Sequence, residues 1–142
     1  MTSSSTPWES FGAHAYCFEP PDIVHIRNSG EISLEDMQHM FGLVQAAAGR
    51  VGGRVFWLAD ITRMGHVRNE ARKFAIDSNI RSVLQGTAIV GGSFQQRAVA
   101  NLAIKAVRLL NPSRSGTPFK FVATEAEARV FIDGIRKNTQ NA

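Results

Sequence analysis

Three short polar motifs mark the expected starts of helices along this chain. In each motif a Ser or Thr is followed three residues later by an acidic residue or a glutamine. The pairs are Ser33 with Asp36, Ser93 with Gln96, and Thr124 with Glu127. Such a pair can satisfy backbone N–H groups that the first turn of a helix leaves unbonded. Apolar side chains follow at three- and four-residue steps, so the motifs predict three amphipathic helices.

Short runs of β-favouring residues alternate with these helices. We expect strands over residues 13–18, 22–27, 54–60, 86–90 and 119–123, and a further helix over residues 69–79 after a turn at Gly65. The predicted order is β-β-α-β-α-β-α-β-α. Strands that alternate with helices form parallel pairs, because a parallel neighbour needs a crossover connection. The sequence therefore predicts an α/β fold with a mostly parallel sheet and an antiparallel edge pair.

Length and composition set the domain organisation. The chain has 142 residues, of which 44% are hydrophobic and 20% charged, as in an ordinary globular protein. We expect a flexible N-terminal tail over residues 1–10, one domain over residues 11–137 and a C-terminal tail over residues 138–142.

Charge and targeting signals narrow the class of protein. The formal net charge is +4, and the sixteen Lys and Arg residues are scattered along the chain, which argues against nucleic-acid binding. The N-terminus lacks the pattern of a signal peptide, and no apolar run approaches membrane-spanning length. We therefore expect a cytoplasmic protein that is not an integral membrane protein.

Several segments resemble the STAS domain of bacterial anti-anti-sigma factors, and in particular its STAS-like branch grouped with CRAL-TRIO lipid-transfer domains. The segments are Gly-Glu-Ile-Ser at 30–33, Leu-Ala-Asp-Ile-Thr at 58–62, Glu-Ala-Arg at 70–72, Gly-Gly-Ser-Phe at 91–94, and residues 121–128. This resemblance implies a regulatory module that binds proteins. Its CRAL-TRIO side implies a carrier or sensor of a small apolar ligand or lipid.

One segment departs from the family pattern. STAS antagonists carry a phosphorylatable serine where the chain enters the helix after the central strand. The matching residues 66–70 read His-Val-Arg-Asn-Glu and contain no hydroxyl group. We therefore expect a module without the usual phosphorylation switch.

Two groups of residues are candidates for binding a ligand or partner. Asp60, Thr62 and His66 follow the central strand, where open α/β sheets hold ligands. Catalysis by these three would need a base aimed at a nucleophile, and turn or capping roles explain Asp60 and Thr62 more simply. Gly91, Gly92 and Ser93 could cradle an anion, although a tight turn and a helix cap explain them more simply.

Metal and cofactor sites are not expected. The four histidines, at 14, 25, 39 and 66, show no paired ligand spacing, and His25 alternates with apolar residues as a surface or edge position would. Cys17 is the only cysteine and lies between aromatic residues, so we interpret it as structural.

The helix predicted over residues 94–110 is the candidate interface. Arg97, Lys105 and Arg108 fall on one polar stripe that we expect to face water, with Ile104 and Val107 at its margins. The remaining apolar arc is wider than packing against one sheet needs. Neighbouring helices can cover it, or it can meet a second copy, a lipid or an apolar ligand.

These observations favour a non-catalytic regulatory or protein-interaction module, acting on another regulatory protein or as a homodimer. A carrier of a small apolar ligand or lipid is the alternative. An enzyme centred on Asp60, Thr62 and His66 is the least favoured interpretation.

Overall fold

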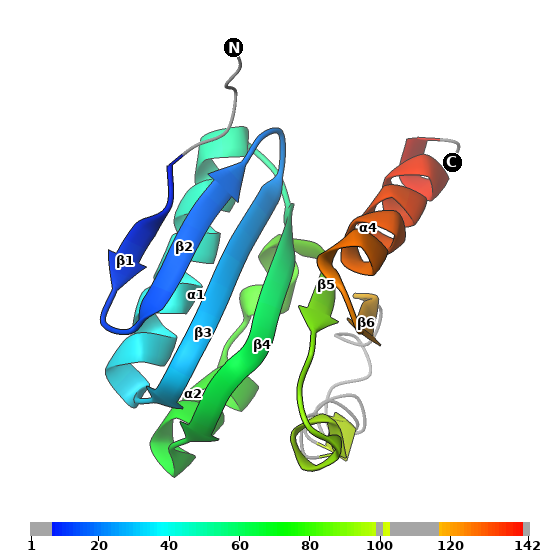
Figure 1. Ribbon diagram of the computed structural model, residues 1–142. Coiled ribbons are helices and arrows are strands. Elements are labelled where there is room, and N and C mark those ends of the chain that lie inside the picture. Colours follow the sequence, from blue (N-terminus) through cyan, green and yellow to red (C-terminus); the bar gives the residue numbers. More distant parts are fainter. Residues whose placement is uncertain (1–6, 99–100, 103–116, 141–142) are drawn as a thin grey trace.

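A six-stranded sheet forms the middle of the molecule in the computed structural model, which describes residues 7–98, 101–102 and 117–140 (Figure 1). The strands are β1 (Glu9–Phe11), β2 (His14–Glu19), β3 (Ile23–Ile32), β4 (Val55–Val67), β5 (Leu84–Val90) and β6 (Phe119–Val122). They lie side by side in chain order. The pairs β1–β2 and β2–β3 are antiparallel, and the pairs from β3 to β6 are parallel. The predicted mostly parallel sheet with an antiparallel edge is confirmed.

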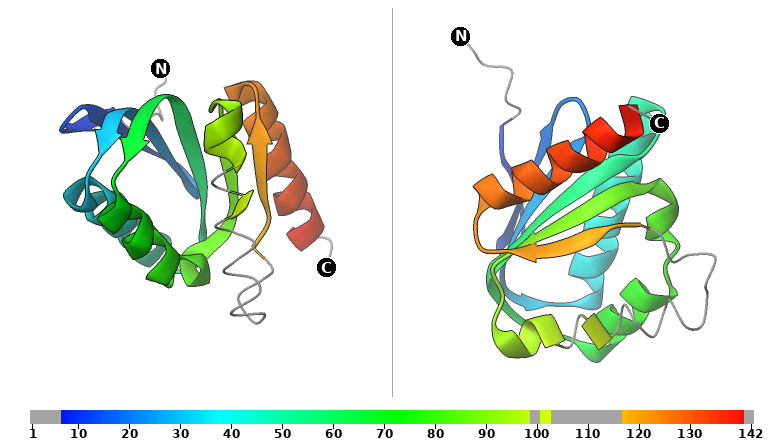
Figure 2. Two further views of the ribbon diagram at one scale, coloured as in Figure 1. Left: turned by 90° about the horizontal axis from the view of Figure 1, so that it is seen from below. Right: turned by 90° about the vertical axis from the view of Figure 1, so that its right-hand side faces the viewer.

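Helices cover both faces of this sheet (Figure 2). The helices α1 (Leu34–Val51) and α2 (Asn69–Asp77) pack on one face, with the short 3-10 helix η1 (Ile80–Val83) beside them. The helix α4 (Glu125–Gln140) packs on the other face. Residues 94–98 are also helical. No helix within the described residues has both the length and the apolar composition that crossing a membrane requires.

The helix α1 begins and ends where its sequence signals predict. The Ser33 hydroxyl accepts a bond from the Asp36 N–H at 3.1 Å, and the Asp36 carboxylate accepts one from the Ser33 N–H at 3.1 Å. Gly52 ends the helix in the left-handed conformation, with φ of 68°, which costs glycine little. The predicted capping box is therefore confirmed.

Two separate apolar cores hold the layers together. Between the sheet and α1 lie Ile26, Ile32, Phe41 and Val44 with their neighbours. Between the sheet and α4 lie Phe56, Leu58, Ala128 and Ile132 with theirs. Complete burial of one such large aliphatic or aromatic side chain contributes about 1.5–3 kcal/mol.

Three sequence expectations need correction. Glu9 and Ser10, which were expected in the tail, lie in β1, because they pair with Tyr16 and Ala15 of β2. Gly65 does not mark a turn, since β4 continues through it to Val67. His25 is not a surface residue: it is 1% exposed.

Candidate functional site

A register shift in β4 turns two charged side chains to one face of the sheet. Arg27 of β3 pairs with Asp60 of β4, and Ser29 pairs with Arg63, so one β3 residue lies opposite two β4 residues. Residues three apart in a regular strand point to opposite faces, and an extra residue of this kind reverses that alternation. Asp60 and Arg63 consequently share a face with Arg27 and Ser29.

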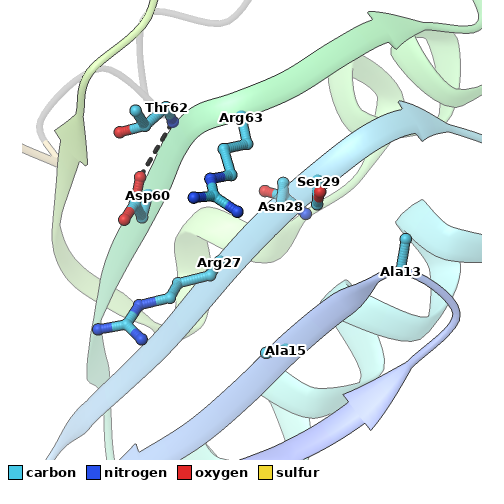
Figure 3. Close-up of a pocket in the computed structure, with 8 residues that line it drawn as sticks. All are labelled: Ala13, Ala15, Arg27, Asn28, Ser29, Asp60, Thr62 and Arg63. Carbon is cyan, nitrogen blue, oxygen red and sulfur yellow. Dashed lines mark hydrogen bonds between the residues drawn. The ribbon is translucent and has the colours of Figure 1, made fainter.

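These four residues line a pocket on the sheet face that also carries α4, beyond the N-terminal end of that helix. We call it the strand-face pocket (Figure 3). Its volume is about 510 Å³. The lining residues are Ala13, Ala15, Arg27, Asn28, Ser29, Asp60, Thr62 and Arg63. The small side chains of Ala13 and Ala15 leave the β2 side of the pocket shallow, and the arginines rise from β3 and β4 beside Asp60.

The three charged side chains of the strand-face pocket differ in the partners that they bind. The Arg27 guanidinium lies 3.2 Å from Glu125 Oε2 and 4.2 Å from the centre of the Trp8 ring. Asp60 Oδ1 accepts a bond from the Thr62 N–H at 3.0 Å. Arg63 is exposed and makes no ion pair with any other described residue. The pocket therefore offers one carboxylate, one cation held by Glu125 and Trp8, and one cation that no described residue pairs with.

A partly buried polar network around His25 holds the Arg27 side of this pocket in place. The Arg129 guanidinium of α4 donates two hydrogen bonds to the Glu19 carboxylate of β2, at 2.7 and 3.1 Å. These bonds lower the pKa of the Glu19 carboxyl. His25 Nδ1 lies 2.9 Å from Glu19 Oε2, and its Nε2 lies 3.7 Å from Glu125 Oε1. The same Glu125 binds Arg27, so β2, β3 and α4 are linked through this one cluster.

His14 fixes the opposite side of the pocket. It is 3% exposed, its Nδ1 accepts a bond from the Ser29 N–H at 3.0 Å, and its Nε2 lies 3.3 Å from Asp36 Oδ2. Because both ring nitrogens are engaged, His14 ties β3 to the start of α1. The two buried histidines therefore have structural partners on either side of the pocket.

The Gly91-Gly92-Ser93 junction is built as a tight turn and a cap. Gly91 and Gly92 have φ of 82° and 92°, and a Cβ on Gly91 would lie 2.6 Å from Thr62 Oγ1. The Gly91 N–H donates to Val122 O at 3.0 Å, and the Ser93 N–H donates to Gln96 Oε1 at 2.8 Å. The Gln96 N–H donates in turn to Ser93 Oγ at 3.1 Å, so the predicted capping box is confirmed. With these N–H groups used internally, the geometry favours the turn-and-cap interpretation over an anion cradle.

Arg97 was expected to stay in water on a polar stripe, but its side chain is bound to the backbone at the ends of the neighbouring strands. Its guanidinium donates to Gly91 O at 3.1 Å and Val122 O at 3.5 Å, and lies 5.5 Å from the centre of the Phe121 ring. Two apolar residues of the predicted helix, Phe94 and Leu102, are 87% and 68% exposed. Ile104, Lys105, Val107 and Arg108 lie outside the described residues.

The start of α2 carries charged side chains in place of a hydroxyl group. Arg68 is the residue before the helix and makes no side-chain cap bond. Its guanidinium instead binds Glu70 at 3.0 Å and Glu31 at 3.5 Å. His66 lies nearby on β4, is exposed, and lines no part of the strand-face pocket.

The structure brings together only part of the predicted site. Asp60 and Thr62 lie in one pocket, whereas no hydrogen bond or ion pair among the described residues joins His66 to either. Sequence reasoning missed Arg27, Ser29 and Arg63. Sequence reasoning assigns side chains to a face of the sheet by their alternation along a strand. The register shift between β3 and β4 breaks this alternation, and it depends on how the two strands pair.

The described part of the chain contains no cluster of three or more His, Cys, Asp or Glu side chains suited to a metal ion. Cys17 is buried, and burial raises the pKa of its thiol. Since the thiolate is the reactive form, this environment fits the structural interpretation of Cys17.

Comparison with known proteins identifies the family of the fold. The model of the SpoIIAA-like family matches residues 23–133. A structure described as the anti-sigma factor antagonist SpoIIAA in its unphosphorylated form aligns with 17% identity and a TM-score of 0.60, covering 86% of this chain and 99% of that one. An uncharacterised DUF3478-family protein with a SpoIIAA-like fold, from Shewanella loihica PV-4, aligns with 18% identity and a TM-score of 0.52, covering 92% and 97%. No curated protein matches the sequence.

Proposed function

Because the chain belongs to the SpoIIAA-like family, we propose that it is a non-catalytic regulatory module of the anti-sigma-factor-antagonist type that binds a protein partner. In this proposal its binding is not switched by phosphorylation at the start of α2. The strand-face pocket is the part of its surface that we assign to the partner.

The observation that carries this proposal is the chemistry of residues 66–70. The helix α2 directly follows β4, which is where STAS antagonists carry their phosphorylatable serine. Here Arg68 occupies the position before the helix and Asn69 is its first residue. Arg68 is already paired with Glu31 and Glu70, so this helix start is occupied by an internal ion-pair cluster.

The contacts around Asp60 support binding rather than catalysis. Nucleophilic catalysis needs a base within hydrogen-bond reach of the nucleophile. The Asp60 carboxylate instead accepts the backbone N–H of Thr62, which is a turn-type contact.

The lining of the strand-face pocket favours a polar partner over an apolar ligand. Apolar ligands are held in pockets lined mainly by hydrophobic and aromatic side chains. Here two arginines, an aspartate, Ser29 and Thr62 stand beside two alanines, and the amide of the remaining lining residue, Asn28, is bonded to Met40 of α1. This lining supports the interaction module over the lipid carrier.

The exposed residues Phe94 and Leu102 favour self-association as a second mode of binding. Their exposed fractions of 87% and 68% leave two large apolar side chains in water on one short segment. Pairing of two copies through this segment would remove them from water, with each buried side chain contributing about 1.5–3 kcal/mol.

Mass spectrometry under native conditions tests the proposal on protein purified from its own cells. The proposal expects the mass of this chain together with a protein partner or a second copy. A chain that carries a stoichiometric lipid or other apolar small molecule would contradict it and support the carrier. Turnover of a substrate that is lost on changing Asp60 to Asn would support an enzyme instead.

A further inference from the structure

We propose that the strand-face pocket binds acidic side chains of a partner protein, with a carboxylate seated between Arg27 and Arg63. This inference rests on the proposed protein-binding function and names the chemistry of the partner.

The first argument is the state of Arg63. The β4 register shift directs this arginine into the pocket beside Ser29, and none of the described carboxylates lies within ion-pair distance of it. A guanidinium presents five donors in a fixed planar fork that matches the two oxygens of a carboxylate. Within the described part of the chain, no carboxylate therefore competes with a partner for the donors of Arg63.

The second argument is the rigidity of Arg27. Trp8 stacks on its guanidinium at 4.2 Å, and Glu125 binds it at 3.2 Å. Glu125 also lies 3.7 Å from the buried His25 and 3.9 Å from Arg129. A side chain that is already ordered loses little further entropy on binding. Arg27 can thus offer its remaining donors to a carboxylate from a fixed position.

The shape of the pocket suits an extended acidic segment. The side chains are short at Ala13 in the β1–β2 turn, at Ala15 of β2 and at Ser29 of β3, so a partner backbone can approach the sheet between the two arginines. A nucleic acid would need a longer row of basic side chains than the two arginines that line this pocket. The geometry therefore favours a few carboxylates on a protein partner over a continuous polyanion.

Asp60 provides a test of the sign of the partner's charge. Its carboxylate lines the pocket and repels an incoming acid, but would attract an incoming base. Asp60→Asn removes the charge and keeps an oxygen to accept the Thr62 N–H bond. The affinity for an acidic partner should therefore rise in this variant, and the affinity for a basic partner should fall.

The experiment measures binding of a fluorescein-labelled oligoglutamate peptide to the full chain by fluorescence anisotropy at low salt. We expect Arg63→Gln to weaken binding roughly two- to fivefold, the effect of one exposed charge pair. Arg72→Gln is the matched control, because Arg72 is an exposed arginine on α2 outside the pocket, and we expect a much smaller change. Asp60→Asn is expected to strengthen binding, and added salt to weaken it.

Equal losses for Arg63→Gln and Arg72→Gln would overturn the inference, because binding would then follow net charge alone. Weaker binding by Asp60→Asn would overturn it by indicating a cationic partner. Phosphatidylserine vesicles provide the remaining comparison: if Arg63→Gln impairs vesicle binding and leaves peptide binding intact, the site serves a membrane surface. Any of these results would take the strand-face pocket out of the assigned partner surface, whereas protein binding by the chain is tested separately by the native mass of the complex.

Discussion

Asp60 and Arg63 point to the same face of the sheet although they are three residues apart in one strand. The register shift against β3 reverses the alternation between them, and this places in one pocket a carboxylate and a guanidinium that has no ion pair among the described residues. The surface chemistry that we assign to partner binding thus depends on one irregularity in the central strand.

The turn after β5 should tolerate no side chain at Gly91. Gly91→Ala places a Cβ 2.6 Å from Thr62 Oγ1 at a φ of 82°, and we expect a loss of about 2 kcal/mol or more in the free energy of unfolding. Gly42→Ala is the control, because a Cβ there meets nothing within 4 Å in the middle of α1. That variant should gain about 0.5–1 kcal/mol. Urea denaturation measures both, and equal effects would refute the close packing of Gly91 on Thr62.

The cap at Ser93 should contribute measurably to stability. Ser93→Ala removes the acceptor of the Gln96 N–H bond, and we expect a loss of about 1 kcal/mol. Gln95→Ala changes an exposed residue in the same first turn and should have little effect. An unchanged urea midpoint and slope for Ser93→Ala would show that this cap does not stabilise the fold.

The ion pair between Glu19 and Arg129 should make stability depend on pH. The bonds from Arg129 lower the folded-state pKa of Glu19 below its ordinary value of 4.5, so the stabilisation is full above that value and is lost as pH falls through the folded-state pKa. Arg129→Gln should cost about 1 kcal/mol or less at neutral pH, because Arg129 is 42% exposed. Urea titrations at several pH values should show this difference shrinking in acid. A difference that is the same at every pH would contradict the electrostatic origin.

Self-association should depend on the exposed residues near residue 94. If two copies pair through Phe94 and Leu102, changing both to Lys should convert a dimer to a folded monomer in sedimentation velocity at micromolar concentration. Val130→Lys is the matched control, since Val130 is 72% exposed on α4, away from this segment. A wild-type protein that sediments as a monomer at this concentration would contradict the dimer.

The sequence predicted the elements better than it predicted the site. Local signals set helix starts, and the boxes at Ser33 and Ser93 form as their spacing indicates. The burial of His25 was not predictable, because Glu125 and Arg129, the α4 residues that complete its cluster with Glu19, lie at least 100 residues further along the chain. The positions of Arg27 and Arg63 depend on strand pairing, which is a tertiary relationship. Asp60 and Thr62 were found because the ends of parallel strands are a general place for binding.

The most direct measurement on the central claim is the phosphorylation state of the chain while it is bound to its partner in its own cells. Intact-mass analysis and peptide mapping would cover residues 62–70, in which Thr62 is the only residue with a hydroxyl group. We predict an unmodified segment in the protein recovered with a partner and in the protein recovered without one. A stoichiometric phosphate on Thr62 that differs between these two populations would contradict a module whose binding is independent of phosphorylation.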